Sequence, residues 1–255
     1  LHYKSVLIRK NIKNSDLGFV VKHAVQFGGF DSDNEKIPST FKNFINVFFS
    51  RTGDSSQPQV DQDYRAGNGL GSFTLYFENN KNFNIYYEHY FDDKSGVKTL
   101  NFGDGLLGFN IKSNKIKFNF EIIDTRNQSG NQHPPGIDSY YFHQVYLFGW
   151  SNKGLTIGNS FIYPNSNRKF VYNLGLKYIN KKSILDLRYA NSKVYLPYQN
   201  KNNNLPFENH TSVISKDNYV FLKYEFLLNK NKSISFGFSK ENDLTNFLFN
   251  YKIKL

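Results

Sequence analysis

The last ten residues, Asn246–Leu255, are the part of the chain that most constrains its fold. A period of two residues predicts a β-strand with one apolar face. A soluble sandwich or barrel also buries such a face, but an amphipathic, aromatic-rich strand at the end of a chain is typical of an outer-membrane β-barrel. We therefore predict an all-β fold, an antiparallel transmembrane β-barrel. The apolar side carries Phe247, Phe249, Tyr251, Ile253 and Leu255, and the polar side carries Asn250, Lys252 and Lys254, with Leu248 as the exception.

Composition agrees with this fold and narrows the chemistry. The 255 residues include 26 Phe and 18 Tyr but no Cys, which excludes disulfides and thiolate metal sites. No apolar run approaches the roughly 18 residues that a membrane helix needs, so a membrane span has to consist of strands. The net charge of +11 predicts an anionic partner. The chain has no basic helix and no zinc-finger spacing, so we expect anionic lipid headgroups or an acidic polymer and no nucleic acid.

Turn signals divide the chain into eleven or twelve strands within a single domain, residues 1–255. Short turns alternate with long loops, as in outer-membrane barrels. The chain begins at Leu1 without Met or a signal segment, so we expect a mature protein or a portion of one. The expected strands are Lys4–Lys10, Leu17–Phe27, Ser72–Glu78, Phe83–Phe91, Leu106–Lys112, Lys115–Ile123, His143–Phe148, Lys169–Ile179, Ser183–Tyr189, Tyr219–Leu228, Ser233–Ser239 and Leu244–Leu255.

One short amphipathic helix is predicted inside the insertion Phe30–Asn68. Pro38–Ser39 offers a start, and apolar residues then recur at helical spacing. We expect this helix to pack against or into the barrel, and docking on a partner is the alternative use of its apolar stripe. The stripe consists of Phe41, Phe44, Ile45, Phe48 and Phe49.

The strand faces opposite the apolar ones carry charges of both signs. This mixture predicts a lumen that is crossed by salt bridges or filled with water, and it does not indicate selectivity for one ion sign. The residues are Lys22, Glu78, Glu88, Lys117, Glu121, Lys177, Asp186, Arg188, Lys223, Glu225, Lys252 and Lys254.

The motifs of the chain do not indicate catalysis, a cofactor or a metal. Gly67–Gly71 is spelled like a phosphate loop, but it precedes a strand and no helix follows. Asp31–Glu35 opens like a calcium loop, yet the Gly and the final acidic residue of such a loop are absent. Asp92–Asp93 and Asp104 are best explained as turn formers instead of a carboxylate pair for glycoside hydrolysis. The six His residues are scattered without ligand spacing, and His23 and His89 are expected at lipid-facing or interface positions.

Aromatic residues of the later half form the candidate binding site. Sugar faces pack on aromatic rings whose polar tips form hydrogen bonds, so these residues are a candidate glycan-binding surface. The alternative is an interfacial girdle, in which Tyr and Trp lie at the level of the lipid headgroups, and the sequence favours this girdle. The residues are Trp150, Tyr140, Tyr141, Tyr146, Tyr195 and Tyr198.

Several segments stand in the order in which similar segments occur in the capsule assembly Wzi family. The chain therefore resembles this family, as it occurs in Bacteroidetes-type bacteria, over most of its length. The resemblance implies an outer-membrane barrel of about eighteen strands, with helices at its periplasmic side, that helps to attach or organise capsular polysaccharide and is not an enzyme. The segments are Lys22–His23 with Gly28–Gly29, Pro38–Phe44, Gly67–Ser72, Tyr86–Gly96, Asn101–Gly108, Asp138–Tyr141, Gly149–Gly154 and Ile157–Asn159.

The chain departs from the family pattern in its strand number and at two positions. Eleven or twelve strands correspond to the C-terminal two-thirds of that barrel, so we expect an N-terminal portion upstream of Leu1. Ser160 stands where the family has Pro, and Leu255 stands where an aromatic residue is expected.

We therefore expect a non-enzymatic, lectin-like outer-membrane protein of a Gram-negative bacterium that assists assembly or surface attachment of capsular polysaccharide or exopolysaccharide. Basic side chains would attract an acidic surface polysaccharide, and rings near Trp150 would orient it. Outer-membrane lipid and other subunits of an outer-membrane complex are further expected partners, and no cofactor is expected. Two alternatives stay open: a porin or substrate-selective channel, and an accessory barrel subunit of a larger outer-membrane complex.

Overall fold

The structure is a computed structural model that describes residues 2–25, 28, 36, 39–49, 69–79, 82–92, 101–128, 140–141, 151–152, 155–156, 159, 161–162, 166–196, 212–229 and 231–253. These residues form one antiparallel sheet of eleven strands, a separate pair of short strands and one helix. No helix among them combines the length and the apolar character that crossing a bilayer requires.

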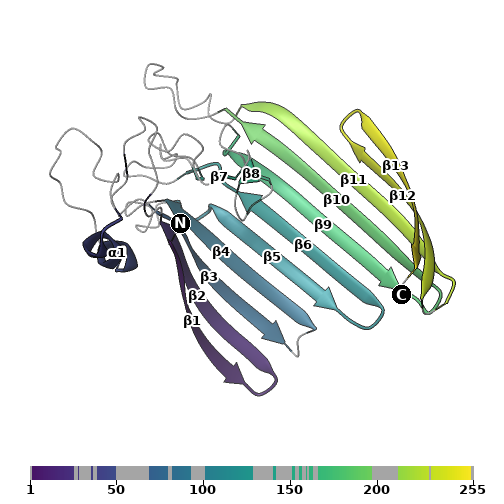
Figure 1. The fold of residues 1–255 in the computed structure, drawn as a ribbon, viewed down its shortest axis with the longest axis horizontal. Coiled ribbons are helices and arrows are strands. Elements are labelled where there is room, and N and C mark those ends of the chain that lie inside the picture. The colour runs from purple at the N-terminus through teal and green to yellow at the C-terminus, as the bar shows by residue number, and fades with distance from the viewer. Residues whose placement is uncertain are drawn as a thin grey trace.

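The eleven strands follow one another across the sheet in chain order (Figure 1). This succession of hairpins confirms the predicted antiparallel all-β fold. Among the described strands, only β7 (Ser151–Asn152) and β8 (Leu155–Thr156) stand outside the sheet, paired with each other. The strands of the sheet are β1 (His2–Ile12), β2 (Ser15–Val25), β3 (Gly69–Asn79), β4 (Phe83–Asp92), β5 (Gly105–Lys112), β6 (Ile116–Asp124), β9 (Lys169–Ile179), β10 (Ser183–Tyr195), β11 (Val213–Leu227), β12 (Lys232–Glu241) and β13 (Leu244–Ile253).

The two ends of the sheet differ in their connections. At one end, five hairpins are closed by turns of two to four residues, and we call this the short-turn end. The opposite, long-connection end carries the segments that follow β2, β4, β6 and β10. The alternation of short turns and long connections confirms the pattern read from the sequence.

The strand register places the predicted lumen residues on one face, which we call the inner face. Glu121 lies opposite Gly108 on one side and Asn173 on the other, and Lys117 lies opposite Lys177. Six of the predicted lumen residues form three ion pairs, namely Lys22–Glu88 at 2.9 Å, Arg188–Asp186 at 3.1 Å and Lys223–Glu225 at 3.1 Å. The outer face carries rows of aliphatic and aromatic side chains, because side chains alternate along each strand. Lys254 lies outside the described residues.

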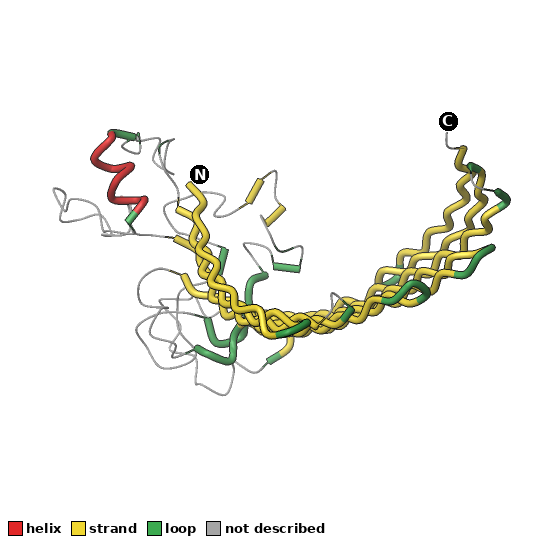
Figure 2. The backbone as a smooth tube through the Cα atoms, turned by 90° about the horizontal axis from the view of Figure 1, so that it is seen from below, coloured by secondary structure: helices red, strands yellow, loops and turns green. Residues whose placement is uncertain are grey.

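The sheet bends into a trough whose two edges are open (Figure 2). β1 and β13 each pair with one neighbour only, so the described residues do not close into the predicted barrel. The reason is spatial, since the edge strands stand on opposite arms of the trough and no described strand bridges them. Side chains of β13 are correspondingly exposed, and Phe247 keeps 83% of its surface.

Strands β10 and β11 extend beyond their predicted limits. Lys193–Lys216 was expected to be a loop, but Lys193 continues β10 and Lys216 belongs to β11, directly opposite it. Polar residues at the strand ends hid this pairing, because the apolar alternation stops before the hydrogen-bonded ladder does. The predicted strand His143–Phe148 lies outside the described residues.

The predicted helix is confirmed as α1 (Phe41–Phe48). The Thr40 side chain accepts a hydrogen bond from the Asn43 N–H (3.3 Å) and caps the N-terminus. Lys4 Nζ, on β1, donates to the carbonyls of Val47 (2.9 Å) and Phe48 (2.7 Å) at the C-terminal end. A cation there satisfies carbonyls that the helix leaves unpaired. The helix therefore packs against the edge of the sheet, as expected.

The larger buried cluster lies on the inner face at the long-connection end. Strand residues contribute Tyr90, Ile123 and Val171, and the connection between β6 and β9 contributes Tyr140, Tyr141 and Ile162. Tyr140 and Ile162 have no exposed surface. The β7–β8 pair of the same connection lies on the concave side of the sheet (Figure 2). Parts of this long connection thus fold inward and fill the inner face at that end.

Candidate glycan-binding groove on the inner face

Two cavities lie next to each other on the inner face and share Phe161 and Asn173. The cavity toward the long-connection end has a volume of about 610 Å³, and the other has a volume of about 940 Å³. Because they share two lining residues, they form one groove, which we call the inner groove. Its lining changes from aromatic and acidic at the long-connection end to basic at the short-turn end.

Aromatic rings form the wall of the groove at the long-connection end. The Tyr90 ring lies edge-on to the rings of Tyr140 and Tyr141, with centroid distances of 6.1 and 6.4 Å. Tyr141 has a positive φ of 62°, an uncommon conformation for a bulky residue that persists only where the surroundings hold it. Tyr90, Tyr141 and Phe161 all line the smaller cavity. The rings therefore form a fixed apolar wall, which is what the apolar face of a sugar requires.

Two carboxylates line the same cavity, and each accepts hydrogen bonds from two donors. Glu88 accepts hydrogen bonds from Lys22 Nζ (2.9 Å) and from Ser72 Oγ (2.5 Å). Glu121 accepts hydrogen bonds from Tyr86 Oη (2.5 Å) and Asn173 Nδ2 (3.0 Å). An ionised carboxylate offers about four lone-pair positions, so each group keeps acceptor capacity for a ligand hydroxyl.

A glycine leaves the space through which the Tyr86 side chain reaches Glu121. Tyr86 and Glu121 lie on β4 and β6, and Gly108 of β5 stands between them in the register. A Cβ atom at position 108 would lie 2.0 Å from Tyr86 Cζ, so the phenol ring crosses β5 only because the side chain is missing. Residues of three neighbouring strands thus determine the position of the Glu121 carboxylate.

A buried aspartate supports the aromatic wall from behind. Asp104 has no exposed surface, and its carboxylate accepts the N–H groups of Asn127 (3.0 Å) and Gln128 (2.6 Å). Burial raises the pKa of Asp104 to about 7, against the lowering effect of these hydrogen bonds. Asn101, in the same turn, donates from Nδ2 to the Tyr140 hydroxyl. Asp104 therefore has a wider role than the turn former that the sequence indicated.

The same turn changes the surroundings of one histidine. His89 lies on the outer face of β4, in agreement with the lipid-facing or interface position that was expected, but it retains only 1% of its surface. The ring of Phe102 covers it at a centroid distance of 5.5 Å, and its Nδ1 donates to the Asp104 carbonyl (2.8 Å). Packing of the turn onto β4 thus removes His89 from the surface.

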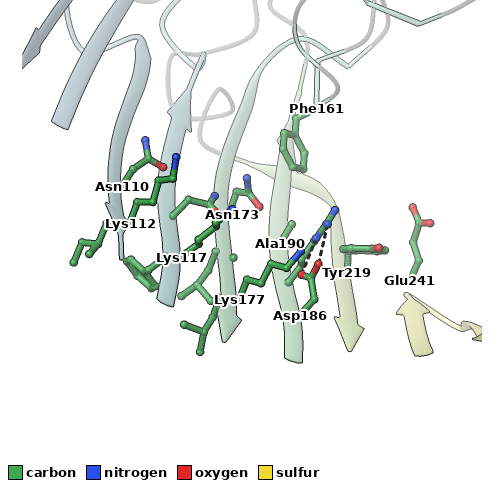
Figure 3. Close-up of a pocket in the computed structure, with 17 residues that line it drawn as sticks. Asn110, Lys112, Lys117, Phe161, Asn173, Lys177, Asp186, Ala190, Tyr219 and Glu241 are labelled. Carbon is green, nitrogen blue, oxygen red and sulfur yellow. Dashed lines mark hydrogen bonds and ion pairs between the residues drawn. The ribbon is translucent and has the colours of Figure 1, made fainter. Parts of the chain in front are cut away.

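Three lysines line the groove toward the short-turn end (Figure 3). Lys112 lies opposite Lys117, and Lys117 lies opposite Lys177, so the three form a row across β5, β6 and β9 that we call the lysine row. Asp186 comes next in this row but is bound to Arg188 by two hydrogen bonds of 3.1 Å. None of the ion pairs formed by the described residues includes a member of the lysine row. Like charges directly opposite each other are destabilising, so an anion between them would relieve repulsion.

The structure separates the aromatic residues that the sequence grouped together. Tyr141 lines the groove, where 6% of its surface stays exposed. Tyr140 is completely buried, so its ring offers no open face to a sugar and its contribution is to support the wall. Trp150, Tyr146 and Tyr198 lie outside the described residues.

Tyr195 lies elsewhere, on the outer face at the long-connection end. Arg126 Cζ lies 5.5 Å from the centroid of its ring and 4.8 Å from that of Phe170. The same guanidinium donates to both carboxylate oxygens of Asp124, at 2.6 to 3.1 Å. A tyrosine at the edge of the outward apolar surface fits the girdle interpretation of the sequence.

Sequence reasoning missed how the groove is assembled. Glu88, Glu121, Lys117 and Lys177 were identified as lumen residues but not as parts of one site, and Phe161 carried no periodic signal. The hairpin register could have revealed the site, because it determines which residues of adjacent strands are neighbours. The register depends on the exact position of each turn, and the sequence alone did not determine that position.

Two stretches resemble a phosphate loop and a calcium loop in sequence. Gly69–Gly71 belongs to β3, so the stretch resembling a phosphate loop leads into a strand, as interpreted. The stretch resembling a calcium loop, Asp31–Glu35, lies outside the described residues. The part of the chain that the structure describes holds no group of three His, Asp or Glu side chains that could bind a metal ion.

Comparison with known families identifies the chain. The family model for the capsule assembly protein Wzi matches residues 12–213, which is most of the sequence. The chain belongs to the Wzi capsule assembly family. This confirms the resemblance read from the segments between Lys22 and Asn159, while the Bacteroidetes type stays a prediction.

Comparisons with individual Wzi-like proteins are more distant. No curated protein matches the chain. Among solved structures, it is similar to Wzi of Escherichia coli, described as a carbohydrate-binding β-barrel of the outer membrane involved in group 1 capsule assembly. The two are 15% identical with a TM-score of 0.48, and the match covers 99% of this chain and 50% of the other. The chain thus spans about half the length of that Wzi protein.

Proposed function

We propose that this Wzi-family chain forms part of an outer-membrane β-barrel of a Gram-negative bacterium, and that it assists assembly or surface attachment of capsular polysaccharide by binding the glycan without catalysis. The observation that carries the proposal is the inner groove, which joins an aromatic and carboxylate end to a lysine row within one continuous surface.

The outer face supports a location in the membrane. On β9, five successive outward side chains are apolar or aromatic, from Phe170 to Tyr178. These positions span about 27 Å along the strand, which corresponds to roughly 21 Å across a bilayer at a tilt near 40° and is close to the ~25 Å apolar band of outer-membrane barrels. Further strands would be needed to close the trough into a barrel, and the family match supports such an arrangement.

The inner groove supports a glycan as the ligand and an acidic glycan in particular. Sugar rings stack on aromatic side chains, and their hydroxyls bind to carboxylates and amides, which Tyr141, Glu121 and Asn173 would supply. The carboxylates of Glu88 and Glu121 are already fixed by hydrogen bonds from Lys22 and Tyr86, which suits them to orient sugar hydroxyl groups. The lysine row would attract carboxylate or phosphate substituents of the same polymer.

Retention of the purified protein on the producing organism's surface polysaccharide tests this function. We expect the Lys117→Gln/Lys177→Gln variant to lose about tenfold in affinity at low salt, because it removes two charges from the groove, and the difference should shrink at high salt. Lys181→Gln/Lys182→Gln is a matched control, since it removes the same charge from the exposed turn after β9. Wild-type protein that is not retained at either salt concentration would contradict glycan binding.

The channel interpretation receives less support from the groove. Tyr140, Tyr141 and Ile162 fill the inner face at the long-connection end, where a porin would need an open path. Ion conductance through the protein reconstituted in a planar bilayer measures this alternative directly. A conductance comparable to that of a water-filled porin would favour the channel.

Docking of α1 on another outer-membrane subunit is a second candidate role. Phe41, Phe48 and Phe49 keep 78, 48 and 59% of their surface, although Val47 and Lys4 fix the helix to the sheet. Exposed aromatic residues on an anchored helix suit a partner groove. Phe41→Glu should abolish co-purification of a stoichiometric partner, whereas Phe41→Leu should retain it. Equal recovery of the partner with both variants would argue against docking through this helix.

A further inference from the structure

A second charged surface lies on the outer face, away from the inner groove. At the long-connection end, the register aligns Asp124, Phe170, Lys193 and Lys216 across β6, β9, β10 and β11. Arg126 follows Asp124 in the chain and stacks on Phe170 and Tyr195. We call Arg126, Lys193 and Lys216 the cationic rim.

The cationic rim carries more positive than negative charge. Asp124 is the only carboxylate in the aligned row, and Arg126 binds it through Nε and one terminal nitrogen. The hydrogen bonds that Arg126 donates to the Asp124 carboxylate raise the pKa of Arg126 above its usual range, so the guanidinium is permanently charged. Lys193 and Lys216 lie directly opposite each other, and none of the ion pairs of the described residues includes them. Two opposed lysines repel each other unless an anion lies between them.

The position of the rim relative to the apolar surface indicates which anion fits. Asn191 and Asn218 form the next outward pair toward the short-turn end, joined by a hydrogen bond of 2.7 Å. Beyond this pair the outward residues of β10 and β11 are Tyr189, Leu187, Val220 and Leu222. We call this outward apolar surface the apolar belt. The rim therefore lies at its long-connection edge, at the level where lipid headgroups begin.

We propose that the cationic rim binds the phosphate-bearing headgroup of a membrane lipid whose acyl chains lie along the apolar belt below it. This inference rests on the proposed location in the outer membrane. The two lysine ammonium groups would contact the phosphate oxygens. Arg126 keeps its second terminal nitrogen outside the bonds to Asp124 and would add a charged donor to the same anion. Tyr195 adds a hydroxyl at the depth that tyrosine favours in membranes.

Lipid retention by the full chain in phosphatidylcholine nanodiscs, with and without phosphatidylglycerol, tests the proposal. Native mass spectrometry counts phosphatidylglycerol molecules that stay bound after release from the disc. We expect the wild type to retain phosphatidylglycerol preferentially and Lys193→Gln/Lys216→Gln to retain about thirtyfold less, since each surface lysine near anionic lipid contributes about 1 kcal/mol. Lys117→Gln/Lys177→Gln is the matched control, because it removes the same charge from the inner face and should retain the lipid.

The possible outcomes separate this proposal from the proposed function. Equal loss with both double variants would show a general charge effect and overturn the cationic rim as a site, as would wild-type protein without preference for phosphatidylglycerol. Protein that inserts into neither kind of disc would overturn the membrane location itself. Far-ultraviolet circular dichroism of each variant shows whether the sheet is intact. Lys193→Arg/Lys216→Arg, which keeps the charge, should restore retention if charge is the cause.

Discussion

The two ends of the inner groove are built from the same sheet but differ in how their side chains are held. At the long-connection end, Tyr140 and Asp104 are buried behind the groove, and Glu88 and Glu121 each accept two hydrogen bonds. At the short-turn end, the lysine row follows from strand register alone, and its members form no ion pair with other described residues.

This difference separates two requirements of a binding surface. Fixed rings and carboxylates orient a ligand without further loss of side-chain freedom, which favours recognition of shape. Exposed lysines attract an anion from a distance but lose rotamer entropy when they bind it, which favours capture of charge. Substitutions at the long-connection end should therefore change stability, and those at the short-turn end should change binding.

The largest difference is expected for alanine substitution of two glycines, one at each end. A Cβ atom at Gly105 would lie 2.2 Å from the Glu88 backbone carbonyl oxygen, and its φ of +156° disfavours a side chain. At Gly175 the nearest atom is the Asn119 side-chain oxygen at 2.1 Å, which can rotate away. We expect Gly105→Ala to lower the free energy of unfolding by ~3 kcal/mol and Gly175→Ala by less than ~1 kcal/mol. Urea unfolding in detergent measures both, and equal losses would contradict a rigid end and an adaptable one.

The next effect is expected at two aspartates. Asp104→Asn replaces one buried acceptor by a donor, which would face the N–H of Asn127 or Gln128, so we expect a loss of ~2 kcal/mol in stability. Asp186→Asn affects an ion pair whose arginine is 60% exposed, and its cost should stay below ~1 kcal/mol. The same unfolding assay compares them. A larger loss of stability for Asp186→Asn than for Asp104→Asn would contradict the stronger fixation of side chains at the long-connection end.

Stability should also depend on pH through Asp104. Its folded-state pKa of about 7 lies above the ordinary value of 3.8, so the folded protein keeps a proton that the unfolded chain releases between these values. The free energy of unfolding should therefore fall as the pH rises from about 4 to about 7 and then level off. The difference in stability between wild type and Asp104→Asn should be larger at pH 5 than at pH 8. A difference that grows with pH would show that the carboxylate is stabilised as an anion.

Much of the fold could be predicted because each hairpin carries its own signals. Alternating side chains gave both faces of the sheet, and the spacing of Phe41 to Phe49 gave α1. The turn after β5 was predicted at Ser113–Asn114, but Ser113 N–H donates to the Ile116 carbonyl (2.7 Å), which places the turn one residue later. Such a shift changes which side chains lie opposite each other, and sequence alternation alone does not determine it.

The candidate site could be predicted less well because it depends on contacts between distant segments. Tyr140 looked like an open sugar platform, but its hydroxyl meets Asn101, 39 residues away in sequence, inside a buried cluster. The lysine row requires both the register of the β5–β6 hairpin and that of β6 with β9. Neither the inward folding of the long connection nor these registers can be recognised from the alternation of apolar and polar residues in the sequence.

The smallest effect is expected at Phe161, where the two ends of the groove meet. Its ring lines both cavities and is packed against the buried cluster around Tyr90, while it keeps part of its surface accessible. If one polymer chain lies along the whole groove, Phe161→Ala removes a single stacking contact between two other sets of contacts. We expect about threefold weaker retention on the surface polysaccharide, since an aromatic contact contributes ~0.5 to 1.5 kcal/mol.

The comparison of ligands of different size then decides whether the two ends act together. A short anionic ligand such as glucuronic acid, which needs the lysine row alone, should bind the wild type and Phe161→Ala equally. Phe161→Leu is the matched control, because it keeps the apolar packing but removes the ring, and it should weaken polymer retention as Phe161→Ala does. Loss of polymer retention with Ala but not with Leu would assign Phe161 to packing of the wall. Equal loss for polymer and monosaccharide would mean that Phe161 belongs to the lysine end alone, and that the groove consists of two separate sites.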